Sequence, residues 1–324
     1  MPLESTRNRL TVAPFCPIVA PLWLGAERPG ADRGAEALLD ALRNRWTLER
    51  VGNHFYRLLD AVELEIDVPQ HAGQRIDQRN LAFQEPIRAA AHRHADLVSA
   101  AIKRGELALT LGGDHALGFG SLTGAARASE RTGVIWIDTH PDLNTPASSP
   151  TGHMHGMPLG TAIGLDARAL PELEALAGRT PMIDPHNVVM LGVRDIDPGE
   201  ADAIRKHGIW NLPMDAWNDT GITSGLERAL HHLEARGVDA VHVSLDFDVL
   251  DPSVMPGTGT RWPGGLSFRE ASQLLRALNG WHGPIRSLDV VELNPVIDPS
   301  GFSTLSASLL LATALGAEMM PRET

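Results

Sequence analysis

The sequence predicts an α/β protein with a mainly parallel sheet that is covered by helices on both faces. Short apolar runs with the composition of strands alternate along the chain with amphipathic stretches of helical spacing. The 324 residues are 43% hydrophobic, which is enough to fill a sizeable core. Since there is no internal repeat or low-complexity tract, we expect one domain over residues 1–324, with flexible ends at 1–13 and 318–324.

The first strand candidate lies near the N-terminus, where Pro14, Pro17 and Pro21 interrupt an apolar run. Because no small-residue cleavage site is obvious, we interpret this run as a strand and not as a signal peptide. The last helix candidate begins with Ser267 and Glu270 in the spacing of a capping box. The strand candidates are Ile18–Leu22, Leu107–Leu111, Val134–Ile137, Val188–Leu191, Val241–Leu245 and Ile285–Val290. The helix candidates are Gly34–Asn44, Pro86–Arg104, Gly225–Arg236 and Ser267–Leu278.

The composition argues against several classes of protein. The net charge is −12 and no basic run stands out, so we expect no nucleic-acid partner. No apolar stretch approaches the roughly 20 residues of a membrane span, so we expect no membrane partner. Cys16 is the single cysteine, which rules out a disulfide within the chain and a metal cage of cysteines. A cytoplasmic enzyme or binding protein is therefore expected, with any metal held by His, Asp and Glu.

Three strand candidates run directly into histidine and aspartate residues, in the motifs GGDH at 112–115, DTHPD at 138–142 and SLDFDVLDP at 244–252. Residues two apart in an extended chain share a face, so the ionisable side chains of each motif can point the same way. In parallel sheets ligands bind beyond the carboxyl ends of the strands. Four carboxylates and two imidazoles suit two divalent ions, with Mn²⁺ as the first choice. The candidate metal ligands are His115, Asp138, His140, Asp142, Asp246 and Asp248.

Each motif also has an ordinary interpretation when it is taken alone. A single Asp-x-His-x-Asp is a weak pattern that also occurs in solvated loops, and Gly-Gly-Asp-His is often a turn with a capping aspartate. Asp251 and Pro252 could simply form a turn. Three such patterns at the ends of three predicted strands are difficult to explain as accident, so together they favour a metal centre.

These motifs resemble those of the arginase/agmatinase ureohydrolases. Further matches are GTGT at 257–260, GGL at 264–266 and ELNP at 292–295, and the set runs in the family's order from about residue 110 to 295. The resemblance implies a three-layer α/β/α fold around a mostly parallel sheet of about eight strands. It also implies two Mn²⁺ ions per chain, a small guanidine substrate and a homotrimer or homohexamer.

The resemblance divides the candidate ligands between two ions. It implies that Asp138 and Asp246 bridge the ions, with His115 and Asp142 completing one site and His140 and Asp248 the other. In the family, a hydroxide that bridges the metals attacks the guanidinium carbon, because the two ions lower the pKa of a shared water.

Three residues are implied to be catalytic. Asp142 matches the carboxylate proposed for proton transfer to the leaving amine, and His155 matches the proton shuttle at the mouth of the site. Glu292 matches the acid that binds the guanidinium. Without the resemblance, Glu292 could equally cap a strand end, and His153 and His155 could be ordinary loop histidines.

The loop after DTHPD is most similar to that of arginases, where it binds the α-carboxylate and α-amino group of arginine. Asn144 matches the carboxylate-binding asparagine, and Asp197 matches the residue that meets the substrate ammonium. Asp195 and Asp197 could also cap a helix that starts near Pro198. The implied substrate-binding residues are Asn144, Thr151, His153, Asp197, Glu200 and Thr260.

The sequence thus favours hydrolysis of L-arginine to L-ornithine and urea. Agmatine, guanidinobutyrate and guanidinopropionate remain alternative substrates, as do a formiminoglutamate hydrolase and a catalytically silent binding paralogue. Four departures from the family pattern bear on this choice. They are Ala116 for the usual Ser, Thr139 for Ala, His153 for Asn and Arg261 for Pro.

Overall fold

The computed structural model describes residues 14–43, 58, 60–70, 72, 81, 83–165 and 177–317. The two ends that we expected to be flexible, residues 1–13 and 318–324, lie outside the described residues.

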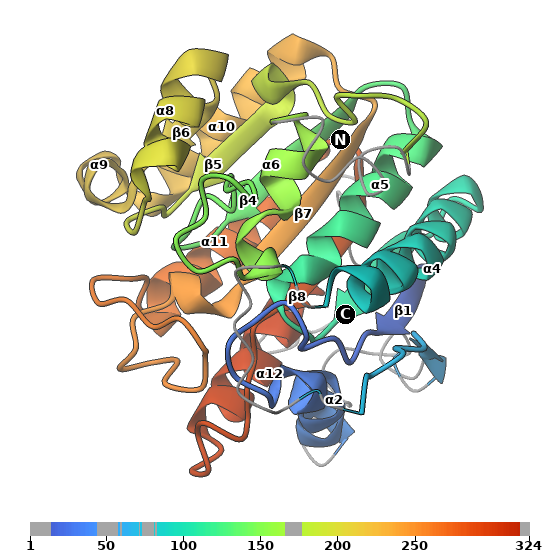
Figure 1. Cartoon of the computed structure of the whole chain (residues 1–324). Helices are drawn as coiled ribbons and strands as arrows, with labels where there is room; N and C mark the ends of the chain where they lie inside the picture. The colour runs from blue at the N-terminus through green and yellow to red at the C-terminus, as the bar shows by residue number, and fades with distance from the viewer. Residues whose placement is uncertain are drawn as a thin grey trace.

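Eight strands of the described residues form one sheet, and every neighbouring pair is parallel, which confirms the predicted fold class (Figure 1). Their order across the sheet is β2-β1-β3-β8-β7-β4-β5-β6. The strands β3, β8, β7 and β4 are therefore adjacent, and their carboxyl ends meet at one edge. The strands are β1 (Phe15–Val19), β2 (Val62–Glu63), β3 (Leu107–Leu111), β4 (Thr132–Ile137), β5 (Val188–Leu191), β6 (Trp210–Leu212), β7 (Ala240–Asp246) and β8 (Ile285–Val291).

Helices cover both faces of the sheet (Figure 1). Along β3, Leu107, Leu109 and Leu111 pack in the core beneath α2, α9, α10, α11 and α12, whereas Ala108 packs beneath α4 and α5 on the other face. The helices are α2 (Gly34–Arg43), α4 (Gln84–Lys103), α5 (Gly118–Ala128), α6 (Pro158–Ala162), α8 (Pro198–His207), α9 (Met214–Thr220), α10 (Ile222–Arg236), α11 (Phe268–Gly280) and α12 (Phe302–Ala314).

Most of the predicted elements are present. The first strand was predicted over Ile18–Leu22 but spans Phe15–Val19, because it pairs residue by residue with β3 from Leu107 to Leu111. The strands β2 and β6 were not predicted, since two and three residues are too few to show a period. The predicted capping box is confirmed, because Ser267 Oγ accepts from the Glu270 N–H and Glu270 Oε2 accepts from the Ser267 N–H.

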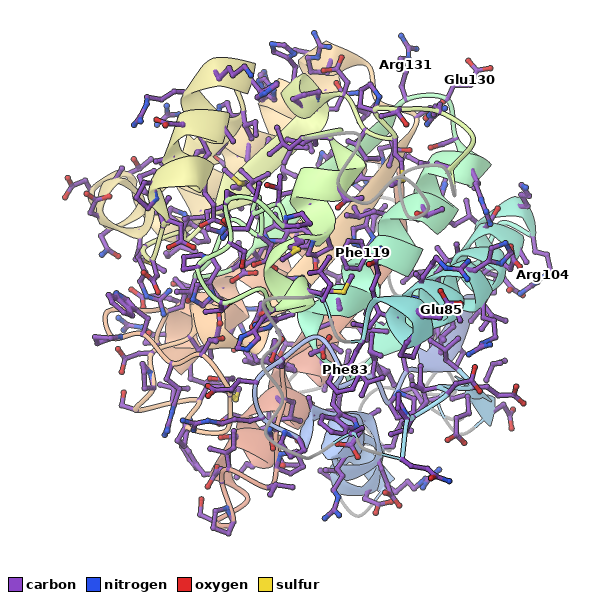
Figure 2. The ribbon with its side chains drawn as sticks, in the orientation of Figure 1. Phe83, Glu85, Arg104, Phe119, Glu130 and Arg131 are labelled. Atoms are coloured by element: carbon purple, nitrogen blue, oxygen red, sulfur yellow. The ribbon has the colours of Figure 1, made fainter. Side chains whose placement is uncertain are left out.

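The helix α5 leads from the carboxyl end of β3 to the amino end of β4, on the opposite side of the sheet. Figure 2 shows Phe119, near the start of α5, in the middle of the molecule, and Glu130 and Arg131, beyond its end, at the periphery. Phe119 is buried, whereas Glu130 and Arg131 are exposed. This crossover returns the chain to the start of β4, as two parallel strands require. Across the described part of the chain, we find no helix with the length and apolar composition of a membrane span.

Candidate metal centre and binding cavity

Loops that follow β3, β4, β5 and β7 line one cavity of about 110 Å³ at the carboxyl edge of the sheet. Four of the six predicted metal ligands reach this cavity, while Asp138 and Asp248 do not and are buried. Among the predicted catalytic residues, Asp142 and His155 line the cavity and Glu292 does not. The structure also brings together on the cavity wall all six predicted substrate-binding residues: Asn144, Thr151, His153, Asp197, Glu200 and Thr260.

One histidine nitrogen lies at the meeting point of three carboxylates. The distance from His115 Nδ1 to Oδ2 is 3.0 Å for both Asp138 and Asp246, and 3.1 Å for Asp142. All four side chains are buried. His115 Nδ1 and Asp138 Oδ2 make no hydrogen bond, although buried polar atoms are normally paired. Nitrogen and oxygen atoms that converge without hydrogen bonds are the arrangement expected of ligands to a metal ion placed between them.

A second group of ligand atoms lies beside the first. His140 Nδ1 is 3.1 Å from Asp248 Oδ2 and 3.5 Å from Asp138 Oδ1. One ligand atom each from Asp138, His140 and Asp248 lies within 4.8 Å of the others, and the same holds for His115, Asp138 and Asp246. Asp138 therefore belongs to both groups, with one oxygen facing each. This arrangement could hold two neighbouring ions that share Asp138.

The electrostatics of the centre also fit bound cations. Burial, together with the charges of Asp248 and Asp138, raises the pKa of the Asp246 carboxyl well above its ordinary value. Several buried carboxylates repel one another and are costly to ionise unless positive charge is added. Two imidazoles and four carboxylates with no sulfur form a donor set that suits Mn²⁺ and similar divalent ions.

The ligand side chains converge by a different route from the one that we expected. The expectation that the acids of each motif share a face of an extended chain was wrong, because β4 ends at Ile137 and Asp248 lies in a 3₁₀ turn, Phe247–Val249. Aspartates close these turns: Asp138 Oδ1 accepts from the His140 N–H, and Asp246 Oδ1 accepts from the Asp248 N–H, both at 2.7 Å. The tight turns, and not the pleat, aim the side chains.

The GGDH motif is both a turn and a source of a candidate ligand. The buried Asp114 carboxylate accepts from the N–H of Ala116 at 2.9 Å and from that of Gly25 at 2.7 Å, so it caps the turn and ties a distant loop to it. Gly113 has a φ of 82°, and a Cβ there would lie 2.6 Å from the Ala20 carbonyl oxygen. Glycine is therefore needed for the turn that directs His115 into the centre.

Backbone strain is concentrated at this edge of the sheet. Among the described residues, three other than glycine have a positive φ, and two of them are Asp142 at 50° and Glu292 at 66°. Each such conformation costs about 1–3 kcal/mol and persists only where the surroundings impose it. Both residues are candidate catalytic residues, so the strain coincides with the site.

Two neighbours that the sequence interpretation missed support His115. Ser244 Oγ lies 2.7 Å from His115 Nε2, and the Trp136 indole stacks on the imidazole with 4.2 Å between ring centroids. The sequence carried a signal for Ser244, because it stands two residues before Asp246 on the same strand, β7, and residues two apart on a strand share a face. Trp136 and Asp138 have the same spacing, but β4 ends at Ile137.

The buried Glu292 pairs with the half-buried His155 next to the cavity. Glu292 Oε1 accepts from the His115 backbone N–H at 2.8 Å and lies 2.9 Å from His155 Nδ1. Burial alone would lower the pKa of His155, but the hydrogen bond and charge of Glu292 outweigh burial and raise this pKa to about 9. Of the two side chains, His155 is the one that reaches the cavity.

Hydrogen bonds connect the residues of the cavity wall. Asn144 Nδ2 donates to Asp197 Oδ2 at 2.8 Å. Glu200 accepts from the N–H groups of Leu143 at 3.0 Å and Asp197 at 2.9 Å, and burial raises its pKa to about 8. Asp197 precedes α8 as predicted, whereas Asp195 does not cap that helix. Its carboxylate instead lines the cavity.

The four departures from the family pattern occupy different places. Ala116 is buried beside Gly25, where a Cβ would lie 2.7 Å from the alanine methyl. Thr139 is buried and donates from its hydroxyl to the Asp248 carbonyl at 2.7 Å. His153 lines the cavity, with 5.9 Å between its ring centroid and that of His155. Arg261 is exposed and does not line the cavity, so it adds no cation there.

By its fold and its site, the chain is a three-layer α/β/α protein with a candidate two-ion centre.

Comparison with known proteins identifies the family. The family model described as the arginase family matches residues 16–320. An arginase of Bacillus caldovelox is 36% identical over 95% of this chain and 99% of its own length, and an arginase of Bacillus subtilis strain 168 is 35% identical over 93% and 97%. A solved arginase structure from Bacillus caldovelox has a TM-score of 0.82 at 34% identity and covers 95% of this chain and 100% of that one. The chain belongs to the arginase family and is a binuclear metal hydrolase of the arginase type.

Proposed function

We propose that this enzyme hydrolyses L-arginine to L-ornithine and urea with two Mn²⁺ ions per chain. One observation carries the proposal: a single cavity joins the candidate metal centre to a wall that contains Asn144 and Asp197. Arginine has a guanidinium at one end and an α-carboxylate and α-ammonium at the other, so it requires both parts of such a cavity. The relatives named arginase support the same choice.

In this proposal Asp138, Asp246, His115 and Asp142 would hold one ion, and Asp138, Asp246, His140 and Asp248 would hold the other. A bound pair of ions would lower the pKa of a shared water and so would supply the nucleophile for the guanidinium carbon. The unpaired His115 Nδ1 and Asp138 Oδ2 support the assignment for the first site.

The leaving amine needs a proton, and two residues at the cavity are placed to donate or transfer one. His155 reaches the cavity, and while it pairs with Glu292 its pKa is raised to about 9, so it carries a proton at neutral pH before the substrate binds. Asp142 lines the cavity next to His115 and can pass on a proton released during the attack. Glu292 now pairs with His155, so its binding to a guanidinium requires the substrate to replace that pairing.

The other end of the substrate meets the wall. We assign Asn144 and the Thr151 hydroxyl to the α-carboxylate, and Asp197 to the α-ammonium. Glu200 holds the loop of Asn144 and the start of α8 together through the N–H groups of Leu143 and Asp197. His153 and Thr260 complete the wall, and Thr260 Oγ1 also donates to Asp248 Oδ2 at 2.9 Å. The non-guanidine end is therefore where substrates are distinguished.

A panel of substrates tests the proposal on the Mn²⁺-loaded enzyme. We expect urea to be released fastest from arginine, and more slowly from agmatine, guanidinobutyrate and guanidinopropionate. No urea from any of these compounds would disprove a ureohydrolase, and faster turnover of agmatine would overturn arginine as the substrate. Formamide release from formiminoglutamate would identify the alternative hydrolase.

Asn144→Ala provides a sharper test of orientation. A lost hydrogen bond to a charged group costs about 1.5–3 kcal/mol, so kcat/KM for arginine should fall about 10- to 100-fold. The kcat/KM for agmatine, which has no carboxylate, should change little. Equal losses of kcat/KM for both substrates would show that Asn144 does not bind the carboxylate.

Assembly and location complete the proposal. We propose a homotrimer or homohexamer, as the family resemblance implies, and a cytoplasmic location, as expected from the sequence composition. Sedimentation of the metal-loaded protein tests the assembly, and fractionation of cells that express it tests the location.

A further inference from the structure

Asp248 owes its position to a short turn and not to a strand. It lies in the 3₁₀ turn Phe247–Val249 beyond the end of β7, and its side chain is buried. Its Oδ2 lies 3.1 Å from His140 Nδ1 and accepts from Thr260 Oγ1 at 2.9 Å. A turn has no ladder of strand hydrogen bonds to fix it, so other contacts must set the direction of this carboxylate.

Thr139 makes two of those contacts. Its buried hydroxyl donates to the Asp248 carbonyl oxygen at 2.7 Å, and its backbone N–H donates to Asp248 Oδ1 at 3.3 Å. Arg194 Nη2 donates to the same carbonyl oxygen at 2.9 Å. The carbonyl therefore has two donors, and it stays paired if the threonine hydroxyl is removed.

The backbone of Thr139 also connects the loop that follows β5. Its carbonyl oxygen accepts from the N–H of Arg194 at 2.9 Å and from that of Asp195 at 3.2 Å. The Asp195 carboxylate in turn lies 3.6 Å from His140 Nε2. One residue thus joins Asp248, the loop of Asp195 and, through the chain itself, the adjacent His140.

We propose that Thr139 is a positioning residue for the ion held by Asp138, His140 and Asp248. Its hydroxyl fixes the 247–249 turn so that the Asp248 carboxylate faces His140. The inference rests on the metal centre proposed above and concerns a hydroxyl that the family's usual alanine cannot supply. Partners that orient a metal ligand typically change metal affinity about 10- to 100-fold.

Thr139→Val tests the hydroxyl, because valine keeps the branched shape and removes the donor. Thr139→Ser is the matched control, because it keeps the donor and removes a methyl group. Manganese is titrated into the full-length metal-free proteins, bound ions per chain are counted by elemental analysis, and the spin-coupled EPR signal reports adjacent ion pairs. The thermal unfolding of each metal-free protein is measured alongside.

We expect Thr139→Val to bind its second ion about tenfold more weakly, with loss of the spin-coupled signal at limiting Mn²⁺. Its affinity for the first ion and its metal-free unfolding midpoint should match those of the wild type, since Arg194 still donates to the Asp248 carbonyl. Thr139→Ser should retain both ions.

Three outcomes would overturn the inference. The first is wild-type binding of both ions by Thr139→Val, and the second is equal weakening by Val and Ser, which would point to packing. The third is a loss of metal-free stability that accounts for the weaker binding. If the wild-type protein itself holds no ion pair, the proposed metal centre fails as well. If the wild type holds two ions and turns over arginine, and Thr139→Val binds both ions as the wild type does, only the role of Thr139 is disproved and the proposed function stands.

Discussion

The two halves of the candidate metal centre are built from different parts of the fold. We call the group of His115, Asp138 and Asp246 the His115 half, and the group of Asp138, His140 and Asp248 the His140 half. The His115 side chain is 2% exposed and bonds through Nε2 to Ser244 in β7. The His140 side chain is 24% exposed, and its Nε2 lies 3.6 Å from an Asp195 carboxylate that is itself 41% exposed.

This difference indicates how each half is held in place. The sheet fixes the His115 half, because His115 is oriented by two residues that are in strands, Trp136 and Ser244. The His140 half depends on loop contacts, above all those of Thr139 and Arg194 with Asp248. A ligand set on rigid elements is better preorganised than one on loops, so we expect the His115 half to bind its ion more tightly.

Asp138→Ala should have the largest effect, because Asp138 belongs to both halves. We expect loss of both ions and of urea release from arginine. Elemental analysis after desalting, together with a urea assay, measures this result. Retention of two ions per chain would contradict the shared role of Asp138 and with it the idea that the halves are coupled.

Metal removal should affect stability in a pH-dependent way. In the metal-free protein, burial and the Asp138 charge raise the pKa of Asp142 to about 6, and burial with the Asp248 and Asp138 charges raises that of Asp246 well above its ordinary value. A group with a raised pKa in the folded state stabilises the fold at low pH, and this stability is lost as pH rises through the folded pKa. The free energy of unfolding should therefore fall between pH 5 and 8 after chelation.

Bound Mn²⁺ should oppose this fall, because the ions favour the ionised carboxylates. Urea unfolding at pH 5 and pH 8, with chelator or with Mn²⁺, tests the expectation. The stability gained from Mn²⁺ should be greater at pH 8. A gain that is the same at both values, or greater at pH 5, would show that these carboxylates do not hold the ions.

Ser244→Ala probes the half supported by the sheet. The substitution leaves His115 Nε2 buried without its partner, so affinity for the first ion should fall about 10- to 100-fold. Ser287→Ala is a matched control, since this buried serine on β8 lies 2.8 Å from His242 Nδ1 and lies outside the candidate ligand groups. Manganese titration should show a loss for Ser244→Ala alone. Equal losses in both variants would indicate a general effect of removing hydroxyls from the core.

Asp195→Asn probes the half supported by loops and should have the smallest effect. Exposed charged pairs contribute about 0.2–1 kcal/mol, so affinity for the second ion should fall only about 1.4- to fivefold. Added salt should reduce the difference from the wild type, because it screens exposed charges. A loss for Asp195→Asn that exceeds the loss for Ser244→Ala would reverse the proposed order of the two halves.

Much of the fold could be predicted from patterns within short segments. Buried strands such as Val188–Leu191 are continuous apolar runs, and the spacing of Ser267 and Glu270 predicted the start of α11. The short strand Trp210–Leu212 carries no such pattern, because it exists through its pairing with β5. The bounds of the first strand are likewise set by pairing, because Phe15–Val19 lies in register with Leu107–Leu111 of β3.

The chemistry of the site could be predicted, but its construction could not. The motifs and the family resemblance named most of the residues that line the cavity, yet the extended-chain argument gave the wrong reason for their convergence. Asp195 was expected only as a helix cap and instead faces His140. Such contacts join residues that are tens of positions apart, so no local period reports them.

The sequence by itself determined which side chains could bind metal and substrate, because residue type and the order of strands and motifs are written in it. It also determined the parallel sheet, since strands that alternate with helices must cross over. Only the tertiary structure decided how β3, β8, β7 and β4 lie side by side and which carboxylates meet at His115. It also gave Thr139 its partner, a carbonyl 109 residues away. The physical reason is that hydrogen bonds and buried charges depend on distance in space, which packing sets.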